Sequence, residues 1–133
     1  MSERKLATAA LNAVLRGDHP AADRALDQLA AQHGMAGVTN ALVTWCDTAL
    51  KQIPSGAGPV TLQWVEHGTA RVHGDANRVR PAERWAGRLL AARAAGDRHT
   101  FIALVESVPP TRAAVGEHVG AMVQMAAHII QGA

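Results

Sequence analysis

The sequence predicts a mainly α-helical fold with five to six helices in two three-helix halves. Apolar residues recur at intervals of three and four over most of the chain, as on the buried face of an amphipathic helix. Gly, Asp and Pro stand where these stretches stop and restart. The chain has 133 residues, which is enough for one hydrophobic core. We therefore expect a single domain, residues 1–133, with pseudo-halves 2–53 and 81–131 and a connector, residues 54–80.

Three helices are expected in the first half, at residues 2–16, 18–33 and 37–52. Gly17 ends the first helix, and Asp18 can cap the second because its carboxylate accepts hydrogen bonds from free backbone N–H groups. Pro20 suits the first turn of that helix, where its missing N–H has no partner to lose. We expect the second helix to end at Gly34.

The connector contains the most linker-like stretch of the chain. Residues 54–59 read Pro-Ser-Gly-Ala-Gly-Pro, and neither Gly nor Pro readily continues a helix. Beyond this stretch, apolar and polar residues alternate on both sides of His67 and Gly68. This alternation favours a short β-hairpin over residues 60–73, with a helix as the alternative.

The second half is expected to contain helices at residues 81–95, 97–108 and 111–131. Pro81 can open the first of them, Gly96 can stop it, and Asp97 can cap the next. The last helix has the clearest apolar face, formed by Val115, Val119, Met122, Val123, Ala126, Ile129 and Ile130.

One arrangement of helix, Gly-Asp and helix occurs twice, first at residues 17–18 and again at residues 96–97. With the same offset, four apolar residues of the first half, Ala22, Ala25, Leu26 and Leu29, fall on Phe101, Leu104, Val105 and Val108. A duplicated three-helix unit explains this similarity. A second explanation is that Gly-Asp is a common stop-and-cap pair between any two helices.

Composition excludes several classes of function. The four aromatic residues are Trp45, Trp64, Trp85 and Phe101, too few for base-stacking platforms or carbohydrate grooves. No apolar run is long enough to cross a bilayer and no signal sequence is recognisable, so we expect a cytoplasmic protein without a membrane partner. The formal net charge is only +2, and we expect no sequence-specific binding of nucleic acid.

Basic residues are concentrated locally, with seven Arg against four acidic residues between positions 61 and 100. Arg80, Arg84 and Arg88 lie on one face of a helix and form a candidate stripe for an anionic partner. The alternative is a solvated helix face that Glu83 partly neutralises. Arg93 falls on the buried side, where we expect it to extend to solvent or to pair with an acid such as Asp97.

Gly116 and Gly120 are four residues apart on the last helix and form a candidate helix–helix interface. Each glycine costs a helix about 1 kcal/mol relative to Ala, so close approach of another backbone is a reason for its presence. Tight packing inside one chain and a contact between two chains explain the pair equally well.

No catalytic, cofactor-binding or metal-binding residues are expected. Cys46 shares a face with apolar residues, which indicates a core position and not a nucleophile. No histidine pair has the spacing of a metal site on a helix, although His67 and His73 would converge if the hairpin forms. The seven histidines are His19, His33, His67, His73, His99, His118 and His128.

The segment Arg84–Asp97, which reads RWAGRLLAARAAGD, resembles a group of small uncharacterised actinobacterial helical proteins. The Ala-rich and Arg-rich composition fits the same resemblance. No activity and no functional residue is attached to that group, so the resemblance implies only a helical fold.

The sequence therefore favours a non-enzymatic helical protein-interaction module that self-associates, with a homodimer as the simplest form. The alternative is a small-ligand binder or an enzyme, with a pocket between the two helical halves near Trp64 and Trp85. No cofactor is expected in either case.

Overall fold

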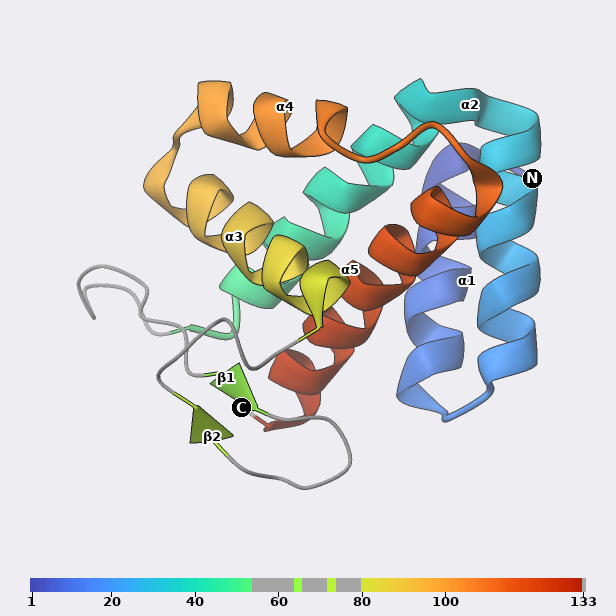
Figure 1. Cartoon of the computed structure of the whole chain (residues 1–133). Helices are drawn as coiled ribbons and strands as arrows, with labels where there is room; N and C mark the ends of the chain where they lie inside the picture. Colours follow the sequence, from blue (N-terminus) through green and yellow to red (C-terminus); the bar gives the residue numbers. More distant parts are fainter. Residues whose placement is uncertain (54–63, 66–71, 74–79, 133) are drawn as a thin grey trace.

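A computed structural model describes residues 1–53, 64–65, 72–73 and 80–132. Over these ranges the protein is mainly helical, as predicted. It has five helices, α1 (Glu3–Leu15), α2 (His19–Leu50), α3 (Pro81–Ala95), α4 (Arg98–Glu106) and α5 (Arg112–Gly132) (Figure 1).

Two short strands lie between α2 and α3 in the chain. β1 (Trp64–Val65) pairs antiparallel with β2 (Val72–His73), with Trp64 opposite His73. These four residues fall inside the segment 60–73, over which a short β-hairpin was predicted. The rest of that segment, with His67, lies outside the described residues, so the structure describes two residue pairs there and not a longer hairpin.

The two Gly-Asp corners adopt the same backbone conformation. Gly17 and Gly96 have φ values of 75° and 70°, in the left-handed region that glycine adopts without a steric penalty. Asp18 and Asp97 follow them, and each carboxylate accepts a hydrogen bond from the backbone N–H three residues later. The predicted stops and caps are therefore confirmed at both corners.

The helical conformation of α2 is interrupted at Gly34. The segment His19–Leu50 consists of two helices that meet at a kink there, where φ is 64° and ψ is −164°. This conformation is open almost only to glycine. One part of α2 runs beside α1, and the other crosses behind α3 and α5 (Figure 1). The predicted end of a helix at Gly34 is therefore confirmed, and the next helix follows directly, earlier than the predicted start at Gly37.

Helix α5 lies at the centre of the molecule. It contacts α1, α2 and α3, and a single core cluster contains buried residues from all five helices. The two predicted halves therefore share one core and do not pack as separate units. The largest fully buried side chains of this core are Trp45, Leu6, Leu29, Leu42, Leu89, Leu90 and Met122.

Trp45 connects the first two helices in this core. Its side chain is fully buried, and its indole Nε1–H donates a hydrogen bond of 3.0 Å to the carbonyl of Ala7 in α1. The bond leaves no polar atom of the indole unsatisfied, which explains how such a large amphipathic side chain is accommodated.

Candidate functional site

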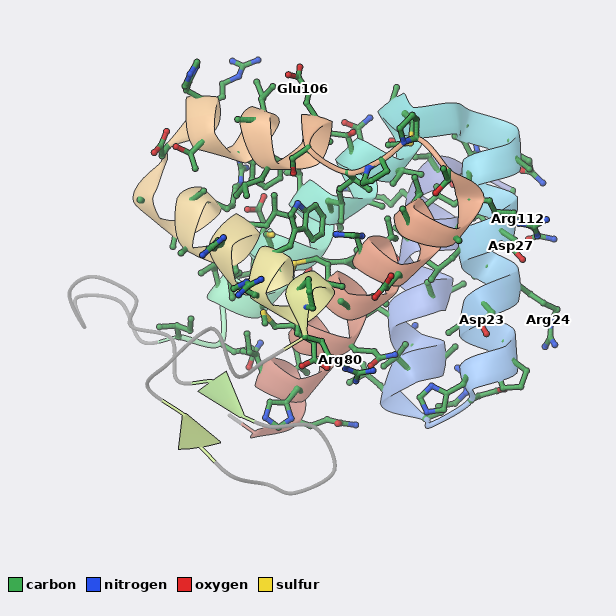
Figure 2. The ribbon with its side chains drawn as sticks, viewed as in Figure 1. Asp23, Arg24, Asp27, Arg80, Glu106 and Arg112 are labelled. Carbon is green, nitrogen blue, oxygen red and sulfur yellow. The ribbon has the colours of Figure 1, made fainter. Side chains whose placement is uncertain are left out.

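The predicted basic stripe does not present three free guanidinium groups. Arg80 forms an ion pair of 2.8 Å with Glu83, and Arg84 is half-buried. Arg88 is exposed. Figure 2 shows Arg80 at the start of α3. The predicted neutralisation by Glu83 is confirmed, and it reduces the charge that the stripe can offer to an anionic partner.

The glycine pair of α5 has open space around it. A Cβ added at Gly116 or Gly120 would meet no heavy atom within 4 Å among the residues that the structure describes. Gly116 is exposed and Gly120 is half-buried. Tight packing within this chain, the first of the two explanations for the pair, is therefore not supported by the described residues.

Trp85 is part of the core and does not line an open site. It is buried, and its Nε1–H donates a hydrogen bond of 2.7 Å to the carbonyl of Leu104 in α4. The His118 ring packs against it in a T-shaped arrangement, with ring centroids 5.1 Å apart and an interplanar angle of 85°. The residue that was expected to mark a ligand pocket is thus occupied with contacts inside the protein.

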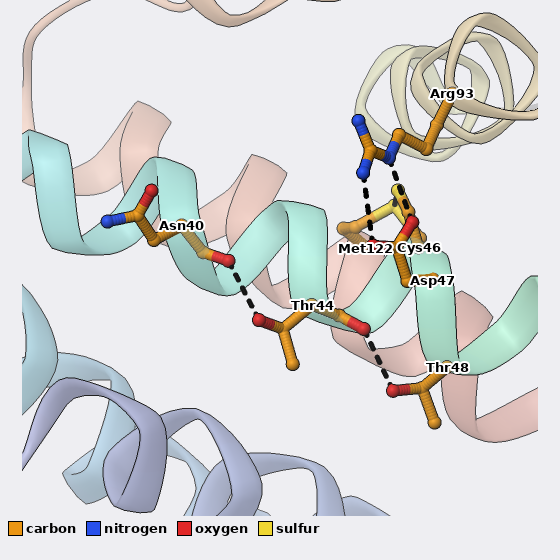
Figure 3. Close-up of polar contacts among 7 residues, drawn as sticks. All are labelled: Asn40, Thr44, Cys46, Asp47, Thr48, Arg93 and Met122. Carbon is orange, nitrogen blue, oxygen red and sulfur yellow. Dashed lines mark hydrogen bonds and ion pairs between the residues drawn. The ribbon is translucent and has the colours of Figure 1, made fainter. Parts of the chain in front are cut away.

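Cys46 lies in the core, as predicted. It is completely buried, and its thiol approaches the sulfur of Met122 at 3.9 Å (Figure 3). Burial raises the pKa of the Cys46 thiol to about 12, and the neighbouring Asp47 carboxylate adds to this effect. A thiol with this pKa is protonated at neutral pH, so it does not act as a nucleophile.

Arg93 pairs with a different acid from the one expected. Its guanidinium makes two hydrogen bonds, of 2.8 and 3.1 Å, to the carboxylate of Asp47 in α2 (Figure 3). These hydrogen bonds raise the pKa of Arg93. Asp97 is unavailable because its carboxylate accepts hydrogen bonds from the backbone N–H and the hydroxyl of Thr100. The expected pairing of Arg93 with an acid is confirmed, but the acid is Asp47 and not Asp97, and Arg93 is exposed and not on the buried side.

No candidate metal site is present among the described residues, where no three His, Cys, Asp or Glu side chains converge. Several histidines have other roles there. His118 contacts Trp85, and the ring of His33 hydrogen-bonds with the carbonyl of Met1 at 3.1 Å. The side chain of His73 in β2 lies outside the described part of the chain.

The outer face of α4 is the feature that the sequence analysis missed. We define the α4 face as Arg98, Ile102 and Glu106, three exposed residues at intervals of four. Ile102 is 42% exposed, one of few large apolar side chains in the described residues with this exposure. Comparison of the two Gly-Asp corners could have revealed this face. The position of α2 that corresponds to Ile102 carries the charged Asp23, so an apolar residue at position 102 is a departure from the repeat.

Comparison of the chain with family models, curated proteins and solved structures finds no match. The resemblance to actinobacterial proteins consequently stays a prediction. Among the described residues, no helix combines the length and the apolar character needed to cross a membrane.

Proposed function

We propose that this protein is a non-enzymatic helical interaction module that self-associates, and that α4 carries the contact. The single observation behind this proposal is the one-sided packing of α4. The helix packs mainly on α3, and its opposite side, where Ile102 lies, is exposed to solvent.

The packing of α4 is incomplete when it is compared with the corresponding part of α2. At the four equivalent apolar positions of α2, three residues are buried and Leu26 is half-buried. In the α4 segment only Phe101 is buried, and the other three, Leu104, Val105 and Val108, are half-buried. A partner that covers α4 would remove this partly exposed apolar surface from water, which favours association.

The contacts of the other candidate groups also favour a binding role over a catalytic one. The thiol of Cys46 is buried and protonated, and the indole of Trp85 is hydrogen-bonded inside the core. Arg93 and Asp47 neutralise each other. These residues stabilise the fold, and no contact among the described residues favours the alternative of a ligand pocket between the halves.

Sedimentation velocity over a wide concentration range tests the proposal. We expect the average mass to rise above that of a monomer as the concentration passes through tens of micromolar. Ile102→Lys should abolish this rise because it places a charge in the apolar centre of the contact. Met35→Lys is the matched control, since Met35 is 49% exposed on α2, and it should associate like the unmodified chain.

The same measurement distinguishes a contact through α4 from a contact through a second candidate surface, the Gly116 and Gly120 pair of α5. Leu at either position would place its Cβ where no heavy atom of the described residues lies within 4 Å. If Gly120→Leu abolishes association and Ile102→Lys does not, the contact lies on α5. A chain that stays monomeric at all concentrations contradicts self-association through either surface.

A further inference from the structure

We propose that the α4 face binds a second copy of this chain in the antiparallel direction, about a twofold axis that passes beside Ile102. This inference rests on the self-association proposed above. It adds the orientation of the two helices and the charge pairs that fix it.

The α4 face carries opposite charges at its two ends. Four residues advance a helix by about 6 Å, so Arg98 and Glu106 stand about 12 Å apart along the axis, with Ile102 between them. Glu106 projects away from the rest of the molecule at the end of α4 (Figure 2). Neither Arg98 nor Glu106 forms an ion pair with another residue in the part of the chain that the structure describes.

Both charges oppose the dipole of their own helix. Arg98 is the first residue of α4, where the helix carries partial positive charge, and Glu106 is the last, where it carries partial negative charge. The isolated helix would be favoured by the reverse order. The observed order therefore needs another explanation, and a complementary partner provides one.

A second α4 that runs in the opposite direction is such a partner. It presents its Glu106 to Arg98 and its Arg98 to Glu106, and the two Ile102 side chains meet at the axis. One patch then pairs with itself, as a twofold symmetric interface requires. A parallel arrangement would instead bring like charges together, which is unfavourable.

The corresponding row of residues in α2, which follows the other Gly-Asp corner, lacks this pattern. The pattern of the α4 face is therefore not a general property of helices that follow a Gly-Asp corner. That row is His19, Asp23 and Asp27, with no apolar residue at its centre and no pair of opposite charges at its ends. Asp27 is also engaged within the chain, in an ion pair of 3.3 Å with Arg112 (Figure 2). The α4 face is thus self-complementary in a way that the α2 row is not.

The contact is expected to be weak. Helix α4 has only nine residues, so the pairing buries less than the about 800 Å² per partner of a standard stable interface. We expect a dissociation constant in the micromolar range, and at this strength the two charge pairs make a measurable difference.

Charge reversal tests the orientation. Arg98→Glu places two acidic residues on the α4 face, and Glu106→Arg places two basic residues there. Each variant alone should associate at least about tenfold more weakly than the unmodified chain, because both pairs become repulsive. An equimolar mixture should associate again, since an acidic face meets a basic face. The double variant Arg98→Glu with Glu106→Arg should also associate, because it restores both pairs in reverse.

Controls separate loss of pairing from loss of folding. Both reversals agree with the helix dipole, so the thermal midpoint of each variant should stay the same or rise. Arg24→Glu is the matched surface control, because Arg24 is exposed on α2 away from α4 (Figure 2), and it should leave association unchanged.

The outcomes distinguish this inference from the proposed function. If the unmodified chain associates but the single reversals do not weaken it, or if their mixture does not recover, the antiparallel α4 contact is overturned while self-association stands. If the unmodified chain remains a monomer, both are overturned.

Discussion

At the scale of single residues, the side chains with the most distinctive chemistry are engaged inside the monomer. Trp45 and Trp85 donate their indole N–H groups to backbone carbonyls, and Cys46 is enclosed by the core. Burial of such groups is favourable only when their polar atoms are hydrogen-bonded. Two features at this scale, the buried thiol of Cys46 and the Asp97 cap, lead to predictions.

The first prediction concerns the reactivity of Cys46. Because its pKa is raised to about 12, the thiol should not react with a thiol reagent such as iodoacetamide at mildly alkaline pH while the protein is folded. In urea the same thiol should react at the rate of a free cysteine. Mass spectrometry of samples taken over time measures both rates, and rapid labelling of the folded protein would show that the core opens around Cys46.

The second prediction concerns acid stability through Asp97. The hydroxyl and then the backbone N–H of Thr100 lower the pKa of the Asp97 carboxyl below its ordinary value of about 3.9. The charged cap therefore stabilises the folded state above that ordinary value, and the stabilisation is lost as the pH falls through the lower folded pKa.

Asp97→Asn keeps the capping oxygen and removes the titration. The thermal midpoint of this variant should fall less steeply with decreasing pH than that of the unmodified chain. Circular dichroism during heating at several acidic pH values measures this slope. Identical slopes for the two proteins would mean that the Asp97 cap does not contribute to acid unfolding.

At the scale of helices, the glycines have opposite roles according to their surroundings. Gly37 is buried in α2, and a Cβ there would clash with Cβ of His33 and lie 3.4 Å from Oε2 of Glu3. Gly37→Ala should therefore lower the free energy of unfolding by about 1–3 kcal/mol.

Gly116→Ala is the matched contrast on α5. Gly116 is exposed with open space beside it, so this change should raise the free energy of unfolding by about 1 kcal/mol through helix propensity. Urea denaturation followed by circular dichroism measures both variants. Equal effects of the two changes would contradict the different surroundings that the structure gives these glycines.

The helix boundaries were predictable because caps and stops are local. Gly17 and Asp18 contain the information for their own corner, and the same holds for Gly96 and Asp97. Gly34 likewise marks the predicted break between two helices. The tight kink at which they meet was not predictable in this way, because the spacing of apolar residues does not specify how soon the next helix begins.

At the scale of the whole molecule, contacts between residues far apart in the sequence could not be predicted. Arg93 and Asp47 are 46 positions apart, and Asp97 is a nearer acid in sequence, so the wrong partner was chosen. The α4 face was missed for a related reason. The apolar stripe of α4 predicts a buried side, but only the arrangement of the other helices decides how much of α4 they cover.

A prediction at this scale concerns nucleic acid. The ion pair of Arg80 with Glu83 leaves less free positive charge on α3 than the stripe of three arginines suggests. We expect duplex DNA to bind with a dissociation constant of about 0.1 mM or weaker, without sequence preference and with strong dependence on salt. Fluorescence anisotropy at physiological salt measures this affinity. Submicromolar binding that Arg84→Ala with Arg88→Ala abolishes would show that the stripe is a functional surface.

The central position of α5 has a consequence for synthesis on the ribosome. The helix that contacts α1, α2 and α3 is the last of the five in chain order, so its apolar face leaves the exit tunnel after theirs. Until then, the nascent chain holds Cys46 without Met122, the α5 side chain that lies against it. The shared core is therefore expected to close only after α5 has left the exit tunnel, and before that its apolar side chains form a surface of the kind that chaperones bind.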